Sequence, residues 1–66
     1  MRVSYYFRNK RVSKEYLIAQ FNMSFVEEIT ADAKAQFSSL LSVKTGSGCN
    51  YSYPTPYGFV TVNVSR

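Results

Sequence analysis

The stretch "SFVEEITADAKAQFSSLL", Ser24–Leu41, decides the fold. Its apolar residues recur at helical spacing and form one stripe, made of Val26, Ile29, Ala33, Phe37, Leu40 and Leu41. Ser24 and Glu27 have the spacing of a capping box, which satisfies free N–H groups at a helix start. Glu27, Glu28 and Asp32 fall in the first turns, where the helix dipole favours acids. The pattern predicts an amphipathic helix over about residues 25–42.

Two strands are predicted before this helix, joined at Arg8–Arg11. Val3, Tyr5 and Phe7 alternate with mostly polar neighbours, which is the period of a half-buried strand. The joint contains an asparagine, which tolerates the positive φ of a short turn. The return run to Phe21 has apolar residues on both faces, so its register stays open.

A second hairpin is predicted after the helix. Residues 49–53 alternate, a Pro-x-Pro turn follows at residues 54–58, and Val60, Val62 and Val64 then alternate with other side chains. We therefore predict one small α+β domain over residues 1–66, in the order ββαββ, with one helix packed on an antiparallel sheet.

An alternative interpretation makes residues 14–21 a helix instead of a strand. Ser13 and Ser24 are then the two N-caps, and the chain is a helix-turn-helix with a C-terminal hairpin. In that case the second helix carries acids where a recognition helix needs groups for phosphates and bases.

Charge is unevenly distributed along the 66 residues, which carry a net charge of +4. Residues 1–14 hold five bases and no acid, whereas the four acids follow between Glu15 and Asp32 with no base between them. A basic end of this kind binds a polyanion or forms internal ion pairs with the acidic segment.

Residues suited to catalysis or metal binding are scarce. The chain has no histidine, and Cys49 is its only cysteine, so a Cys–His pair, a disulfide within the chain and a Cys/His zinc site are all excluded. Glu28 and Asp32 are spaced to share a cation, but a solvated helix turn explains them equally. We expect no enzymatic activity, cofactor or metal. With no secretion signal and no apolar run of membrane-spanning length, we expect a soluble, cytoplasmic protein.

The leading functional hypothesis is binding of single-stranded nucleic acid. Cations and aromatic side chains would share a surface if the two hairpins adjoin in one sheet. The candidate phosphate contacts are Arg8, Lys10 and Arg11. The candidate stacking residues are Tyr6, Tyr51, Tyr53 and Phe59.

The fragment "YGFVTV", residues 57–62, resembles the second half of the RNP1 motif of RNA-recognition modules, in which strand aromatics stack on bases. Its first four residues match that half. Thr55 and Pro56 stand where the motif has a basic residue and a glycine, and Val62 replaces the last aromatic. The resemblance implies RNA stacking and covers these residues only.

The competing hypothesis is a small inhibitor or adaptor, for example one encoded by a phage or mobile element, that binds a host protein. Tyrosine and arginine are also enriched at protein-binding hot spots. The candidate contacts on this hypothesis are Glu27, Glu28, Asp32 and Tyr57. Strands 49–53 or 59–64 would form an exposed edge, through which a homodimer is possible.

Overall fold

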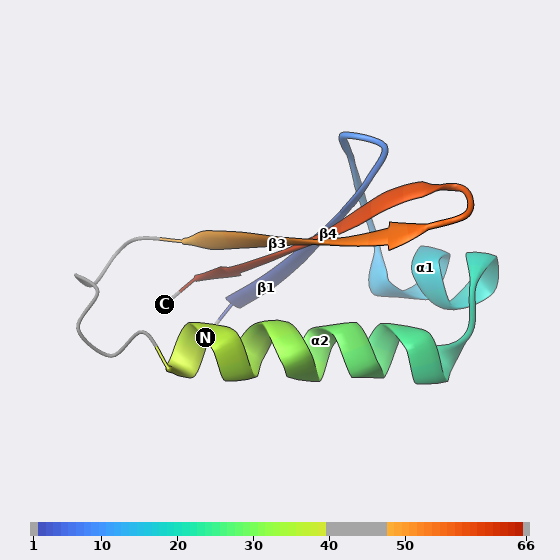
Figure 1. Ribbon diagram of the computed structural model, residues 1–66. Coiled ribbons are helices and arrows are strands. Elements are labelled where there is room, and N and C mark those ends of the chain that lie inside the picture. The colour runs from blue at the N-terminus through green and yellow to red at the C-terminus, as the bar shows by residue number, and fades with distance from the viewer. Residues whose placement is uncertain (1, 40–47, 66) are drawn as a thin grey trace.

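The computed structural model describes residues 2–39 and 48–65. The elements are β1 (Arg2–Phe7), β2 (Lys10–Val12), α1 (Lys14–Gln20), α2 (Met23–Ser38), β3 (Cys49–Thr55) and β4 (Gly58–Ser65). The four strands form one antiparallel sheet in the order β2-β1-β4-β3, and both helices lie on the same side of it (Figure 1). The predicted α+β fold with an antiparallel sheet is confirmed.

The core lies between α2 and the central strand β4. Val60, Val62 and Val64 are completely buried on the side of the sheet that faces the helices. They meet the apolar stripe of α2, whose buried members are Val26, Ile29, Ala33 and Phe37. Leu40 and Leu41, the other two residues of the predicted stripe, lie outside the described residues. Burial of each large aliphatic side chain contributes about 1.5–3 kcal/mol, so this contact stabilises the sheet and the helix together.

The start of α2 differs from the prediction. Asn22 is the N-cap, and its side-chain oxygen accepts a hydrogen bond from the backbone N–H of Phe25 at 2.7 Å. Ser24 already lies inside the first turn, so the capping box predicted for Ser24 and Glu27 is wrong. Asparagine caps a helix as well as serine does, and an earlier cap adds two residues to the N-terminal end of α2.

The return strand predicted from Val12 to Phe21 is wrong beyond Val12, and the helical alternative for residues 14–21 is right for this segment. Strand β2 ends at Val12, because the Ser13 side chain accepts a hydrogen bond from the Tyr16 N–H at 3.0 Å and caps α1. Helix α1 buries Leu17 completely. Tyr16, Leu17, Ile18 and Ala19 thus belong to a short helix, and Phe21 follows at its C-cap. Ile18 and Phe21 are half-buried beside the core.

A hydrogen-bond relay fixes β1 to α2. The Thr30 hydroxyl donates to the Val26 carbonyl oxygen at 2.7 Å, and the Tyr5 hydroxyl lies 2.8 Å from the same Thr30 oxygen. Because the single Thr30 hydrogen is already used, Tyr5 is the donor to Thr30. This bond satisfies the polar end of a buried tyrosine ring, which would otherwise oppose folding.

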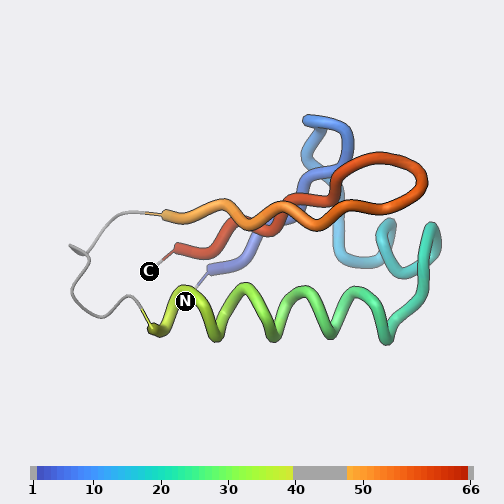
Figure 2. Tube along the Cα trace, viewed as in Figure 1, coloured from blue at the N-terminus to red at the C-terminus, as the bar shows by residue number. Residues whose placement is uncertain are grey.

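Arg8 connects the turns of the two hairpins. It occupies the β1–β2 turn with Asn9, and both have positive φ (53° and 66°), as type I′ hairpin turns require. Its Nε donates to the Tyr57 carbonyl oxygen in the β3–β4 turn at 2.8 Å. Gly58, with φ 126°, passes so close that an added Cβ would stand 3.3 Å from Arg8 Cγ. Figure 2 shows both turns at the end of the molecule where α1 lies.

We expect Leu17→Ala to destabilise the protein by about 2–5 kcal/mol, because it leaves a cavity under α1 while alanine keeps the helix propensity. Urea denaturation followed by circular dichroism measures the change. The neighbouring exposed variant Tyr16→Ala is the control and should unfold close to wild type. Equal midpoints for Leu17→Ala and wild type would contradict the burial of α1 against the core.

Candidate nucleic-acid interface

One face of the sheet carries no helix. We call it the open face, and its residues are Arg2, Ser4, Tyr6, Arg11, Asn50, Ser52, Pro54, Phe59, Thr61, Asn63 and Ser65. One row of it crosses all four strands, because Tyr6 pairs with Arg11 on one side and with Thr61 on the other, and Thr61 pairs with Ser52. Tyr6 is half-buried within this row.

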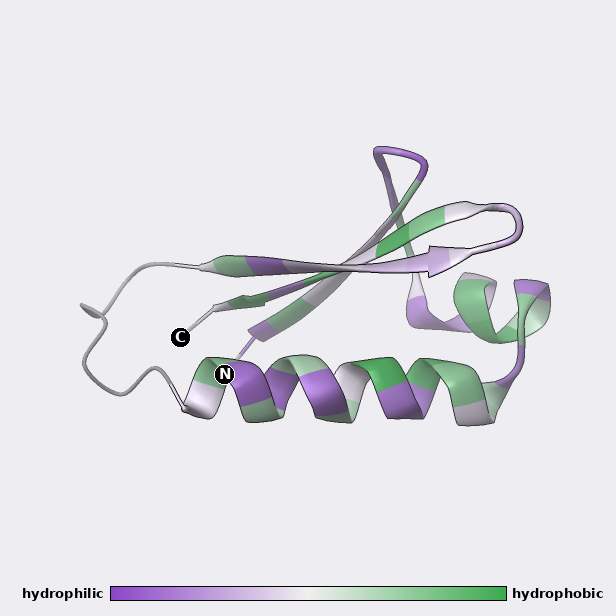
Figure 3. Ribbon diagram, viewed as in Figure 1, coloured by the Kyte–Doolittle hydropathy of each residue, from purple (hydrophilic) through white to green (hydrophobic). Residues whose placement is uncertain are grey.

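Charge separates between the two layers of the molecule. All four acids of the sequence lie on the helices: Glu15 on α1, and Glu27, Glu28 and Asp32 on α2. The strands contain no acid, and the β1–β2 hairpin contains Arg2, Arg8, Lys10 and Arg11. The tip of that hairpin is strongly hydrophilic (Figure 3). The sheet layer is therefore positively charged and the helix layer holds every acid.

Three of the predicted nucleic-acid contacts come together on the open face. Tyr6 and Arg11 are cross-strand partners. Phe59 is 62% exposed and lies two residues along β4 from Thr61, the partner of Tyr6, so Phe59 and Tyr6 are diagonal neighbours on the two strands. Lys10 pairs with Phe7, so its side chain starts from the helix-facing side of the edge strand β2.

Arg8 makes two contacts within the fold. Besides its bond to the Tyr57 carbonyl, its guanidinium lies over the Phe7 ring, 5.2 Å from the ring centre. Arg8 lies in an exposed turn, but its guanidinium packs on Phe7, whose ring is on the helix-facing side, so Arg8 is not part of the open face.

Tyr51 and Tyr53, predicted to stack on bases, do not lie on the open face. Tyr51 pairs with Val62 and Tyr53 with Val60, so both rings face the helices and pack against the core. The Tyr51 hydroxyl is buried and makes no hydrogen bond of ordinary geometry with any of the described residues. Burial, with the nearby Cys49 thiol as a second cause, raises the pKa of Tyr51.

The Tyr53 hydroxyl connects β3 to α2 by donating to Asp32 Oδ2 at 2.6 Å. Gln36 Nε2 donates to the same oxygen at 2.7 Å. These two bonds, that from Tyr53 first, hold the pKa of Asp32 below its ordinary value of 3.8. Burial and then the bond to Asp32 raise the pKa of Tyr53, so its hydroxyl remains a donor through the neutral range. Asp32, a predicted protein contact, is thus engaged within the fold.

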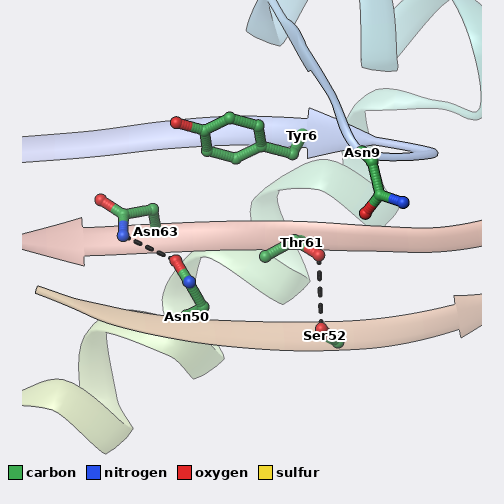
Figure 4. A pocket seen from close by; sticks show the side chains of 6 residues that line it. All are labelled: Tyr6, Asn9, Asn50, Ser52, Thr61 and Asn63. Carbon is green, nitrogen blue, oxygen red and sulfur yellow. Dashed lines mark hydrogen bonds between the residues drawn. The ribbon is translucent and has the colours of Figure 1, made fainter.

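A shallow hollow of about 380 Å³ lies on the open face (Figure 4). Its lining residues are Tyr6, Asn9, Asn50, Ser52, Thr61 and Asn63. Asn63 Nδ2 donates to Asn50 Oδ1 at 2.6 Å, and the Ser52 and Thr61 hydroxyls lie 3.3 Å apart. Apart from Tyr6, these residues were not predicted as a site from the sequence. The sequence signal that could have identified them is alternation: Asn50 and Ser52 alternate with the tyrosines of β3, and Thr61 and Asn63 alternate with the valines of β4.

The residues predicted to contact a partner protein lie away from the open face. Glu27 and Glu28 are exposed on α2. Tyr57 is 62% exposed and lies 6.2 Å from the Phe21 ring, in a groove that also contains Phe25. Residues 59–64 belong to β4, which is paired on both sides, so the prediction of an edge there is wrong. Strand β3 is an edge strand, as predicted for residues 49–53.

Within residues 2–39 and 48–65, no three acidic or cysteine side chains gather in a way that would hold a metal ion. Neither helix has the length and apolar character needed to cross a membrane.

Tyr53→Phe should lower the thermal midpoint at pH 7 and have a smaller effect near pH 2.5. The depressed pKa of Asp32 means that its bonds stabilise the fold above the ordinary pKa, and that this contribution is lost as pH falls through the folded value. Thermal unfolding of both proteins across this pH range measures the difference. Tyr57→Phe is the control, and a pH-independent effect of Tyr53→Phe would contradict the assignment.

The chain was compared with protein-family models, with curated proteins and with solved structures. None of the three comparisons finds a match. A proposal about the function of the open face therefore rests on its own side chains, their positions and their charges.

Proposed function

We propose that the protein binds single-stranded nucleic acid on the open face of its sheet. The observation that carries the proposal is the separation of charge: the strands hold no acid and the β1–β2 hairpin holds four bases. A phosphate backbone is attracted to such a surface and is not repelled by the acids, which lie on the helix layer.

Exposed rings beside the cations favour a single strand over a duplex. Phe59 and Tyr6 present ring surface on the open face, and unpaired bases stack on such rings with a gain of about 1–3 kcal/mol per base. Arg11 stands beside Tyr6, where it can neutralise the phosphate of a stacked nucleotide. Arg2 extends the charge along β1, and Lys10 and Arg8 extend it toward the hairpin tip.

Phe59→Ala should weaken binding of a fluorescently labelled single strand by about 5- to 150-fold, because one stacking contact is lost. Fluorescence anisotropy measures the affinity. Tyr57→Ala is a matched control, since this ring is equally exposed, at 62%, but lies in the groove with Phe21 and Phe25. Equal losses in the two variants would contradict stacking on the open face.

The salt dependence of binding should report the number of cations in contact. With Arg2, Lys10 and Arg11 on phosphates, affinity for a single strand should fall about 20-fold between about 50 and 200 mM salt. Arg11→Gln should reduce that fall to about 7-fold. Lys34→Gln removes the same charge from α2 and should leave the salt dependence unchanged. A salt dependence that is the same in Arg11→Gln and wild type would remove Arg11 from the interface.

A second candidate function is binding of a basic protein segment on the helix layer. It is favoured by the groove of Phe21, Phe25 and Tyr57, which lies beside the first turns of the acidic helix α2. Aromatic side chains of this kind anchor protein interfaces, and Glu27 and Glu28 would attract a basic partner. On this hypothesis single strands do not bind even at low salt, so the anisotropy titration separates the two functions.

A further inference from the structure

The hollow on the open face has free hydrogen-bonding groups on two adjacent strands. The bond from Asn63 to Asn50 uses one N–H and one oxygen lone pair. An asparagine amide carries two N–H donors and an acceptor oxygen, so the pair retains donors on both nitrogens and the whole Asn63 Oδ1 as an acceptor. No other hydrogen bond from the described residues reaches these amides.

The remaining lining groups are also available to a ligand. The Ser52 and Thr61 oxygens are separated by 3.3 Å, well beyond the usual 2.7–2.8 Å or so for hydroxyl pairs, so their bond to each other is weak. Tyr6 supplies an aromatic ring from β1, and in Figure 4 this ring extends along the strand toward the Asn50–Asn63 end of the hollow. Among the described residues, no charged side chain lines the hollow.

We propose that this hollow receives one nucleobase of the bound strand and prefers adenine, a proposal that rests on the proposed function. Stacking on Tyr6 alone tolerates any base. Arginine and lysine read guanine, and aspartate and glutamate read cytosine, but neither kind of residue is among the described side chains that line the hollow. A carboxamide pairs with the amino group and ring nitrogen of adenine, and Asn50 and Asn63 supply carboxamides with free donors and a free acceptor.

The size of the hollow supports a single small ligand. Its volume of about 380 Å³ is near the lower end of the range of about 300–1,000 Å³ found for small-molecule sites. Phe59 lies on the same face, outside the hollow, and can stack the neighbouring base. One base is thus read by hydrogen bonds while the next is held without selection.

The test uses labelled oligothymidine strands that carry one central adenine, cytosine, guanine or thymine, titrated by anisotropy at low salt. Wild type should bind the adenine strand about 5- to 150-fold more tightly than the others. The double variant Asn50→Thr/Asn63→Thr keeps residues that strands favour but removes both amides, and it should bind all four strands equally. Gln20→Thr removes an exposed amide from α1 and should keep the adenine preference.

Equal affinity of wild type for the four strands would overturn the proposal, and so would preference for another base. An adenine preference that persists in the double variant, shown to be folded by circular dichroism, would overturn the role of the amides. In all of these outcomes salt-sensitive binding persists. If wild type shows no salt-sensitive binding to any of the four strands, the proposed function and the adenine site are both overturned.

Discussion

The contact between α2 and β4 is the constraint on which the other elements depend. β4 is the only strand of the described sheet with two long neighbours: its residues 60–65 pair with β1 and its residues 58–64 with β3. Its three valines are completely buried under α2. The valines of β4 recur every two residues, and the apolar stripe of α2 follows the roughly 3.6-residue period of a helix. The two apolar surfaces pack against each other only in the strand register that turns the valines toward α2. A shift of one residue in β4 would expose the valines and bury Thr61 and Asn63.

This constraint also determines which residues form the open face. Because α1 and α2 both cover the same side of the sheet, every second residue of each strand is left facing solvent. The acids then lie on the helix layer, where Asp32 is held by Tyr53, and the bases of the hairpin lie beside uncharged strands. The open face is thus basic and partly aromatic as a direct result of how the core is packed.

Much of the fold could be predicted from the sequence, because the stripe of α2 and the alternation of β3 and β4 are strong periodic signals. Helix α1 was not the preferred interpretation, since seven residues with apolar side chains on both faces satisfy either period. The cap at Asn22 was missed because Ser24, two residues later, has the same chemistry followed by a well-placed glutamate. The ambiguity over α1 is resolved by tertiary packing, above all by the burial of Leu17.

The candidate site was only partly predictable for a related reason. Alternation shows that Tyr51 and Tyr53 share a face, but it does not show which face the helix covers. That depends on the register with β4, which pairs Tyr51 with Val62. Tyr6, Arg11 and Phe59 were selected from their chemistry, whereas the neutral side chains of the hollow carry no such signal one by one.

The pairing of β1 with β4 has a consequence for how the protein is made. These two strands are adjacent in the sheet, yet Arg2 is paired with Ser65 at the opposite end of the sequence. Bringing β1 and β4 together across so long a stretch of chain is slow, and no stabilising contacts between them can form until β4 has been synthesised. During synthesis the first hairpin and both helices therefore emerge without the strand that completes their core. Folding of the sheet must follow translation of residues 58–65, and until then the apolar stripe of α2 is open to chaperones and to aggregation.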